Sequence, residues 1–168
     1  MKSKKKTIWQ SVVLLLLIAG TVVTVSLQRS KPYQKDTGFV FGTVYNITYQ
    51  HGENIKADIE AELQKVDNSL SPFNKQSIIS KINRNENIDA DEMFIHVFKL
   101  AQEISVETGG AFDITVAPLV NAWGFGFKSG IKPDKHTIDS LRQLIGYEKV
   151  TLAGNKIKKT DRRIMLDC

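Results

Sequence analysis

Hydrophobic and polar residues alternate with different periods along this chain, and each period predicts a different element. The residues between Lys6 and Arg29 carry no charge, and as a helix they are long enough to cross a hydrocarbon core of about 30 Å. Residues 39–50 are rich in β-branched and aromatic side chains, which predicts a strand. Gly42 within it indicates a bulge or the close approach of another group. Residues 54–70 place apolar side chains at helical spacing and predict an amphipathic helix.

Two further helices are expected in the middle of the chain. Ser77 is placed to cap a short helix over 78–83, because a serine hydroxyl accepts hydrogen bonds from the first free backbone amides. A longer helix is expected over about 90–108. Gly109 and Gly110 follow it and are suited to the left-handed conformation that ends many helices.

The last third of the chain mixes short helices and strands. Pro118 suits the first turn of a helical segment, and Thr137 is expected to cap another short helix. Three strands are expected over 147–153, 156–160 and 162–168. This order predicts an α+β fold with an antiparallel or mixed sheet and packed helices, preceded by an N-terminal transmembrane helix. Because the last strand has no stop signal, we expect the domain to be incomplete at its C-terminus.

These patterns divide the chain into a membrane anchor or signal segment (1–29), a polar linker (30–38) and a globular part (39–168). Lysines before the apolar run favour an amino terminus in the cytoplasm, which places the globular part in the periplasm or outside. A cleaved signal peptide is the alternative, although the small-x-small cleavage pattern is poor. Lipidation after the apolar run is excluded, because the chain's single cysteine is Cys168.

Charge and cysteine content exclude several classes of protein. Of the 23 basic residues, seven lie in the first 35 positions together with no acid, so the remaining 16 face 18 acidic residues and leave a formal charge of −2. The globular part therefore has no basic footprint for nucleic acid. One cysteine allows no internal disulfide, and we expect Cys168 to be a small buried side chain.

The stretch 108–126 is the first candidate for chemistry. Asp113 is the one charged residue in a segment that also contains four glycines and the aromatic residues Phe112, Trp123 and Phe125, with Phe127 just beyond. A flat aromatic ligand with N–H donors would suit ring faces and one carboxylate. The alternative is structural: Asp113 binds backbone amides in a turn and the aromatic residues fill the core.

Two other segments allow the same pair of interpretations. In residues 70–83, the polar residues Ser71, Asn74, Ser77 and Asn83 surround Phe73. They form either a pocket wall or a turn with a helix cap. Gly42 and Thr43 form either a ligand-side bulge or part of an ordinary edge strand.

In this order, the segments resemble the FAD:protein FMN transferases, the ApbE-like family. The resemblance covers residue 39 to the end and rests on "FGTVYNITY", "LSPFNKQSIISKIN", "TGGAFDITVAPLVNAWGFG" and "RRIMLDC". It implies an enzyme that binds FAD and, with Mg²⁺, transfers FMN to a Thr or Ser of a target protein and releases AMP. The implied partners are FAD, an acceptor protein of a membrane redox complex, and the inner (plasma) membrane through the N-terminal helix.

The resemblance also implies which residues contact FAD. They are Phe41, where the family often has Met, Phe73, where it often has Tyr or Trp, and the triplet Ala111, Phe112 and Asp113. The family's magnesium ligands and catalytic residues lie beyond the last motif, so we expect none in this chain and no activity of the chain alone. An exported flavin-binding or scavenging module is one alternative. A tethered domain without a ligand is another.

Overall fold

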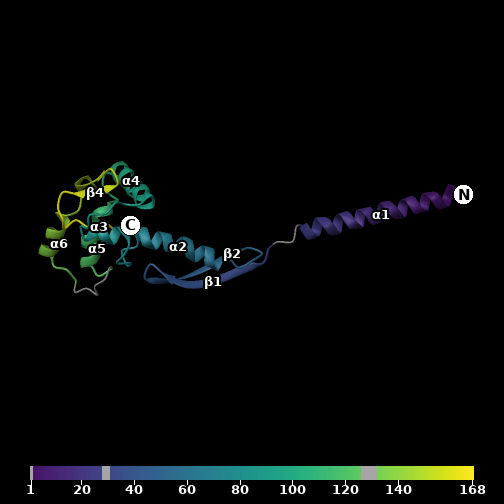
Figure 1. The fold of residues 1–168 in the computed structure, drawn as a ribbon, viewed down its shortest axis with the longest axis horizontal. Coiled ribbons are helices and arrows are strands. Elements are labelled where there is room, and N and C mark those ends of the chain that lie inside the picture. Colours follow the sequence, from purple (N-terminus) through teal and green to yellow (C-terminus); the bar gives the residue numbers. More distant parts are fainter. Residues whose placement is uncertain (1, 28–30, 126–131) are drawn as a thin grey trace. The chain divides into compact units, whose positions relative to one another are not determined.

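The computed structural model describes residues 2–27, 31–125 and 132–168, and the chain forms two compact units. The first unit contains Met1–Asp36 and Ile47–Ile55. The second contains Thr37–Asn46 and Lys56–Cys168. Figure 1 labels the elements of both.

The first unit begins with helix α1, Lys2–Leu27. Within it, Ile8–Ser26 has a mean hydropathy of 2.2 and no buried part. These 19 residues rise about 28 Å as a helix, which matches the hydrocarbon thickness of a bilayer. By length and composition, α1 can therefore cross a membrane.

The segment after α1 is a hairpin rather than a linker and one strand. Strand β1, Tyr33–Val40, pairs with β2, Thr43–Gln50. The segment expected as a linker over 30–38 is a strand from Tyr33 onward. The strand expected over 39–50 is confirmed for Thr43–Gln50, but the chain reverses at Phe41 and Gly42. Both residues have positive φ, 54° and 74°, as a two-residue hairpin loop requires. Phenylalanine is rare in that conformation, so only Gly42 indicated a turn in the sequence.

At the end of the hairpin opposite its turn, hydrogen bonds between polar side chains stabilise the first unit. Asp36 is buried, and its carboxylate accepts hydrogen bonds from Tyr49 Oη at 2.6 Å and Asn54 Nδ2 at 3.3 Å. Tyr49 Oη in turn accepts from the amide of Ile55 at 3.0 Å. Desolvation, with the hydrogen bond to Asp36, raises the pKa of Tyr49.

Helices are the most abundant regular elements of the second unit, and their order agrees with the predicted one. In chain order they are α2 (Lys56–Leu70), α3 (Ile78–Asn83), α4 (Glu92–Glu107), the 3-10 turn η1 (Ile114–Val116), α5 (Ala117–Ala122) and α6 (Lys135–Arg142). Ser77 caps α3 as predicted. The predicted cap Thr137 is wrong: Asp134 caps α6 by accepting from the Thr137 amide at 2.7 Å. The helix thus begins earlier than expected, and Thr137 lies inside its first turn as a donor to the cap.

The core of the second unit is built on α4. Phe94, Phe98 and Ala101 are buried at helical spacing, and the two rings stack with centroids 6.3 Å apart. Ile79 and Ile114 pack in the same cluster. After α4, Gly109 and Gly110 have φ of 60° and 82°, so the predicted left-handed helix end is confirmed.

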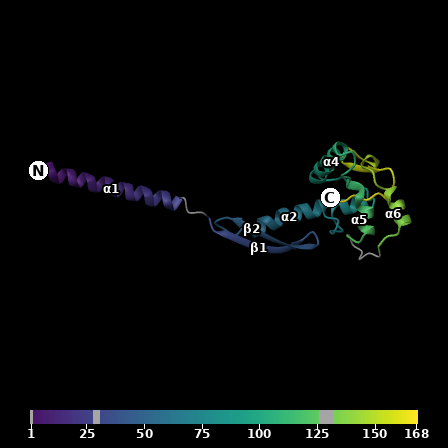
Figure 2. The same cartoon turned by 180° about the vertical axis from the view of Figure 1, so that it is seen from behind.

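The carboxyl-terminal part contributes one small antiparallel sheet. The turn η2, Tyr147–Lys149, leads into β3, Val150–Ala153, which pairs with β4, Lys156–Lys159. The mixed helix and strand content, with small antiparallel sheets, confirms the predicted α+β class. Figures 1 and 2 show the chain end among the helices of this unit.

The expected strand over 162–168 is wrong. Side chains and single backbone groups, not a strand ladder, satisfy its backbone. Asn83 Oδ1 accepts from the Leu166 amide at 2.7 Å, Asn83 Nδ2 donates to the Leu166 carbonyl at 2.9 Å, and the Asp167 amide donates to the Ile114 carbonyl. Ile164 and Leu166 are buried, so the apolar pattern reflects burial without pairing. Cys168, expected to be buried, is exposed.

Candidate functional site

Two of the predicted flavin contacts, Phe41 and Phe73, line one cleft of about 330 Å³ in the second unit. We call it the aromatic cleft. Its lining is Phe41, Val66, Leu70, Ser71, Pro72, Phe73, Val97, Asp167 and Cys168. Phe73 is 47% exposed, so its side chain does not fill the core. The hairpin turn and the segment after α2 thus supply two rings to the same space.

The approach of these two segments depends on the backbone at the turn. A Cβ at Gly42 would lie 3.2 Å from Cγ and Cδ1 of Phe73, so a larger residue would push the turn from the ring. This confirms the predicted close approach at Gly42. Phe41 has φ of 54°, a conformation that costs a non-glycine residue about 1–2 kcal/mol. The fold holds a phenylalanine at the cleft despite that cost.

The aromatic cleft also contains an unsatisfied polar atom. Ser71 is 3% exposed, and its Oγ has no hydrogen-bond partner within the described ranges. Its carbonyl, by contrast, accepts from Ser77 Oγ at 2.7 Å. A buried hydroxyl without a partner costs about 1–3 kcal/mol, and such atoms in native structures usually mark a water or ligand position. Asp167 shares this lining, and desolvation raises the pKa of its carboxyl group.

A neighbouring cleft of about 440 Å³ shares Pro72, Phe73 and Asp167 with the aromatic cleft. Its other polar lining residues are Lys75, Ser80, Asn83, Arg84 and Asn121. Together the linings of the two clefts contain aromatic rings, the carboxyl group of Asp167, and amide and cationic side chains. That combination can bind a ligand with one apolar ring system and one polar or anionic part.

Asp113 has a structural role in the fold. Its Oδ1 accepts from the amide of Thr115 at 2.8 Å and from Thr115 Oγ1 at 2.6 Å, and its Oδ2 accepts from the amide of Tyr147 at 2.8 Å. Thr115 Oγ1 also accepts from the Gly146 amide at 2.8 Å. The carboxylate therefore caps η1 and ties it to η2. A carboxylate has about four acceptor positions, so one on Oδ2 remains for a ligand.

The other two predicted contacts are at the surface. Ala111 and Phe112 are exposed just after the glycine pair, and neither lines the aromatic cleft or its neighbour. Phe112 is 44% exposed, Trp123 43% and Phe125 80%, so the interpretation of these rings as core filling is wrong. Phe125 lines the neighbouring cleft. Phe127 lies outside the described residues.

Some lining residues were not predicted. The sequence did not single out Asp167 or Asn121, because each lies in an apolar motif. Only the fold shows that both residues line a cleft. Asn83 was predicted as a candidate pocket residue. In the structure its side-chain amide forms two hydrogen bonds with the backbone of Leu166. Within the described ranges, no three His, Cys, Asp or Glu side chains group closely enough to hold a metal ion. These residues do not fit a magnesium site, and we assign no ligand to one.

Comparison with known proteins gives a consistent set of matches. The model of the ApbE family matches residues 41–168. The FAD:protein FMN transferase of Vibrio cholerae serotype O1 is 28% identical over 164 residues, covering 91% of this chain and 49% of the relative. The FAD:protein FMN transferase of Haemophilus influenzae is 32% identical over 165 residues, covering 86% and 47%.

Solved structures agree with these sequence matches. The flavin transferase ApbE from Vibrio cholerae superposes with a TM-score of 0.70 at 29% identity, over 81% of this chain and 48% of that chain. The chain therefore spans about half the length of the curated relatives it matches.

Proposed function

Because this chain belongs to the ApbE family, we propose that it forms part of an FAD:protein FMN transferase and supplies the binding surface for the flavin. The single observation that supports this best is the aromatic cleft, which Phe41 and Phe73 line together with Ser71, whose buried hydroxyl has no hydrogen-bond partner among the described residues. The two relatives named FAD:protein FMN transferase match 91% and 86% of this chain.

The proposed reaction moves a phosphoryl-linked group. The hydroxyl oxygen of a Thr or Ser on the acceptor protein bonds to the phosphorus of the FMN half of FAD. The bond from that phosphorus to the bridging oxygen breaks, its electron pair stays with AMP, and the hydroxyl proton is released. Such transfers depend on positioning and charge stabilisation more than on covalent help from the protein. The residues described here contribute positioning.

The size of the aromatic cleft decides which part of FAD it takes. Ligand pockets usually enclose about 300–1,000 Å³, and this cleft, at about 330 Å³, is near the lower end. We therefore assign it the isoalloxazine ring, with Phe73 stacking on the ring face and Ser71 Oγ bonding a ring edge. The polar neighbouring cleft is left for the remainder of the dinucleotide.

Asp113 remains a proposed ligand contact. Three hydrogen bonds hold its carboxylate rigidly, and one acceptor position on Oδ2 is unused. A group preorganised in this way accepts a ligand N–H or O–H with little loss of side-chain entropy. Phe112 and Ala111 lie beside it at the surface, where they can contact the same ligand.

Magnesium, the acceptor and the membrane complete the proposal. Mg²⁺ is proposed as the source of charge stabilisation for phosphoryl transfer, and the described residues do not themselves form its site. The acceptor is a protein of a membrane redox complex. In this proposal helix α1 anchors the chain in the inner (plasma) membrane, and the four lysines before its apolar part favour a globular part in the periplasm or exterior.

The test uses the full-length protein with FAD, Mg²⁺ and a candidate acceptor. Mass spectrometry should detect one FMN on a Thr or Ser of the acceptor. Phe73→Ala should weaken FAD binding by at least about tenfold, since one aromatic stack on a base or flavin-like ring is worth about 1–3 kcal/mol. Phe39→Ala, which truncates a 72% exposed ring outside the cleft, is the matched control.

The outcomes separate the alternatives. FAD binding without FMN transfer to any acceptor favours the flavin-binding or scavenging module. Absence of FAD binding, shown by an unchanged melting temperature at saturating FAD, favours a domain without this ligand. A ligand at 100 times its dissociation constant would otherwise stabilise the protein by about 2.7 kcal/mol.

A further inference from the structure

A third cleft lies on the second unit between β4 and the loop that follows α3, separate from the aromatic cleft. It has about 220 Å³, and its charged lining residues are Lys156, Lys158, Lys159, Arg162 and Glu86. We call it the basic cleft. It shares no lining residue with the aromatic cleft or its neighbour, so the flavin proposal does not account for it.

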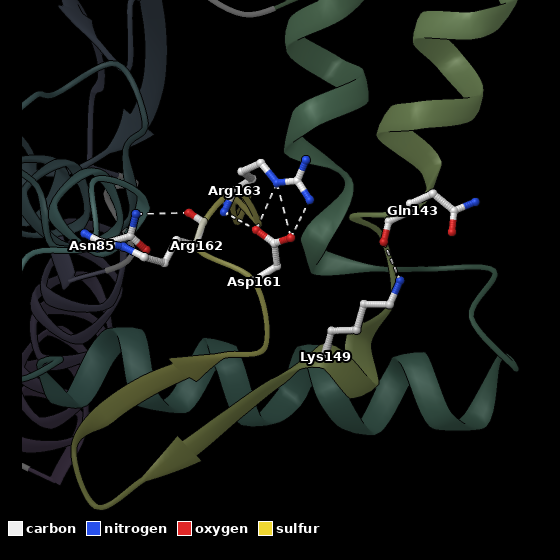
Figure 3. Close-up of polar contacts among 6 residues, drawn as sticks. All are labelled: Asn85, Gln143, Lys149, Asp161, Arg162 and Arg163. Carbon is white, nitrogen blue, oxygen red and sulfur yellow. Dashed lines mark hydrogen bonds and ion pairs between the residues drawn. The ribbon is translucent and has the colours of Figure 1, made fainter.

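The acidic groups nearby are already engaged. Glu86 Oε1 accepts from Arg84 at 2.8 Å and 2.9 Å. Arg84, which does not line the basic cleft, therefore neutralises Glu86, and the charges of the three lysines and Arg162 are not balanced by it. Figure 3 shows the Asp161 carboxylate bound by the Arg163 guanidinium, with a closest contact of 2.6 Å. Among the described residues, no carboxylate lies within salt-bridge distance of the lysines or Arg162 of the basic cleft.

Several N–H groups of these cations remain available. Lys156 Nζ donates to Asn87 Oδ1 at 2.7 Å and keeps two N–H groups. Lys159 Nζ donates to the carbonyls of Ile82 and Ile164 at 3.1 Å and 2.9 Å and keeps one. These bonds to uncharged oxygens fix the ammonium groups in place without neutralising them.

The loop that carries Arg162 is also fixed. Asn85 Nδ2 donates to the Arg162 carbonyl at 3.0 Å, as Figure 3 shows. Burial and, to a smaller extent, the positive charge of Arg162 lower the pKa of Lys159 to about 8. The fold therefore keeps like charges together at a cost in free energy. A bound anion would reduce that cost, because an excess of cationic side chains in a cleft concentrates the opposite ion.

We propose that the basic cleft binds a phosphate group. Phosphate carries up to two negative charges and at least three strong acceptor oxygens, which matches a set of four cations better than a single carboxylate does. The volume of about 220 Å³ fits one such group and not a folded protein segment. Inorganic phosphate and the headgroup of an anionic phospholipid offer the same chemistry, and the proposal stands independently of flavin transfer.

The test follows the accessibility of Lys158 to an amine-reactive reagent in the full-length protein. In detergent, inorganic phosphate is titrated against chloride at equal ionic strength, and Lys99 on α4 serves as the internal reference. In a second arm, the protein is placed in nanodiscs of phosphatidylcholine with and without phosphatidylglycerol. Selective protection of Lys158 by dissolved phosphate identifies the free ion, and protection only in anionic nanodiscs identifies a headgroup.

Variants decide whether the protection comes from this cleft. Arg162→Ala should raise the phosphate concentration for half-protection by at least about tenfold, because charge-assisted hydrogen bonds are the strong ones. Arg142→Ala removes an exposed arginine from α6 and should leave that concentration unchanged. Equal effects of the two variants, or no selective protection of Lys158 in either arm, would overturn the proposal.

Discussion

Thr115 offers the sharpest test of how the 108–126 motif is held. It is fully buried, its Oγ1 donates to Asp113 Oδ1 at 2.6 Å, and it accepts from the Gly146 amide at 2.8 Å. Thr115→Val keeps the shape and removes the hydroxyl. The buried Gly146 amide then lacks an acceptor, which costs about 1–3 kcal/mol, and Asp113 loses one charge-assisted bond worth about 1.5–3 kcal/mol. We expect a loss of about 3–5 kcal/mol of unfolding free energy.

Thr115→Ser provides the matched control, since it keeps the hydroxyl and loses one methyl group worth about 1 kcal/mol. Urea unfolding of the full-length protein and its variants, followed by circular dichroism, measures both losses. The expected result is a clear gap, with the valine variant at least about 2 kcal/mol less stable than the serine variant. If the two variants unfold at the same midpoint, the hydroxyl bridge between η1 and η2 does not carry the stability assigned to it.

Three further predictions concern the aromatic cleft and the basic cleft. Ser71→Ala should leave the free protein equally or more stable, because it removes an unpaired buried hydroxyl, yet weaken FAD binding about tenfold. Thermal melts with and without FAD measure both effects, and a loss of stability without FAD would contradict the unpaired state. Phe41→Asn should relieve backbone strain, since Asn tolerates positive φ, while FAD affinity falls; a destabilised variant with unchanged affinity would refute this. Because burial lowers the pKa of Lys159 to about 8 from 10.5, the unfolded chain binds more protons between these values, so stability should rise with pH across that window. Urea unfolding at pH 7.5, 9 and 10 should show a smaller rise in Lys159→Met, and equal slopes would count against the shift.

The sequence predicted the helices of the second unit because their signals are local. Apolar spacing defined α2 and α4, and Ser77 capped α3 where expected. The glycine pair ended α4 in the left-handed conformation that glycine tolerates best. Each of these features depends on residues within one or two turns, so no knowledge of the rest of the fold was needed.

The predictions for the hairpin and for residues 162–168 were wrong because contacts between distant segments override local conformational preference. The hairpin turn places Phe41 at positive φ, and the contact between Gly42 and Phe73 that accompanies it joins segments some thirty residues apart. Residues 162–168 have the composition of a strand, but Asn83 takes over the hydrogen bonds that a neighbouring strand would make. Neither outcome can be read from the composition of the segment itself.

Asp113 shows why the two interpretations of a motif need not exclude each other. The structural interpretation expected backbone amides around the carboxylate, and the amides of Thr115 and Tyr147 are there. It also expected the neighbouring rings inside the core, and Phe112 is nearly half exposed. A carboxylate held by its own fold, with one acceptor position left and an exposed ring adjacent, is more rigid than a free surface carboxylate. Under the proposed flavin contact, the bonds that stabilise the fold also prepare the carboxylate for a ligand. A loss of FAD affinity in Asp113→Asn without a matching loss in Thr115→Val, which removes a structural bond but keeps the carboxylate, would separate the two roles.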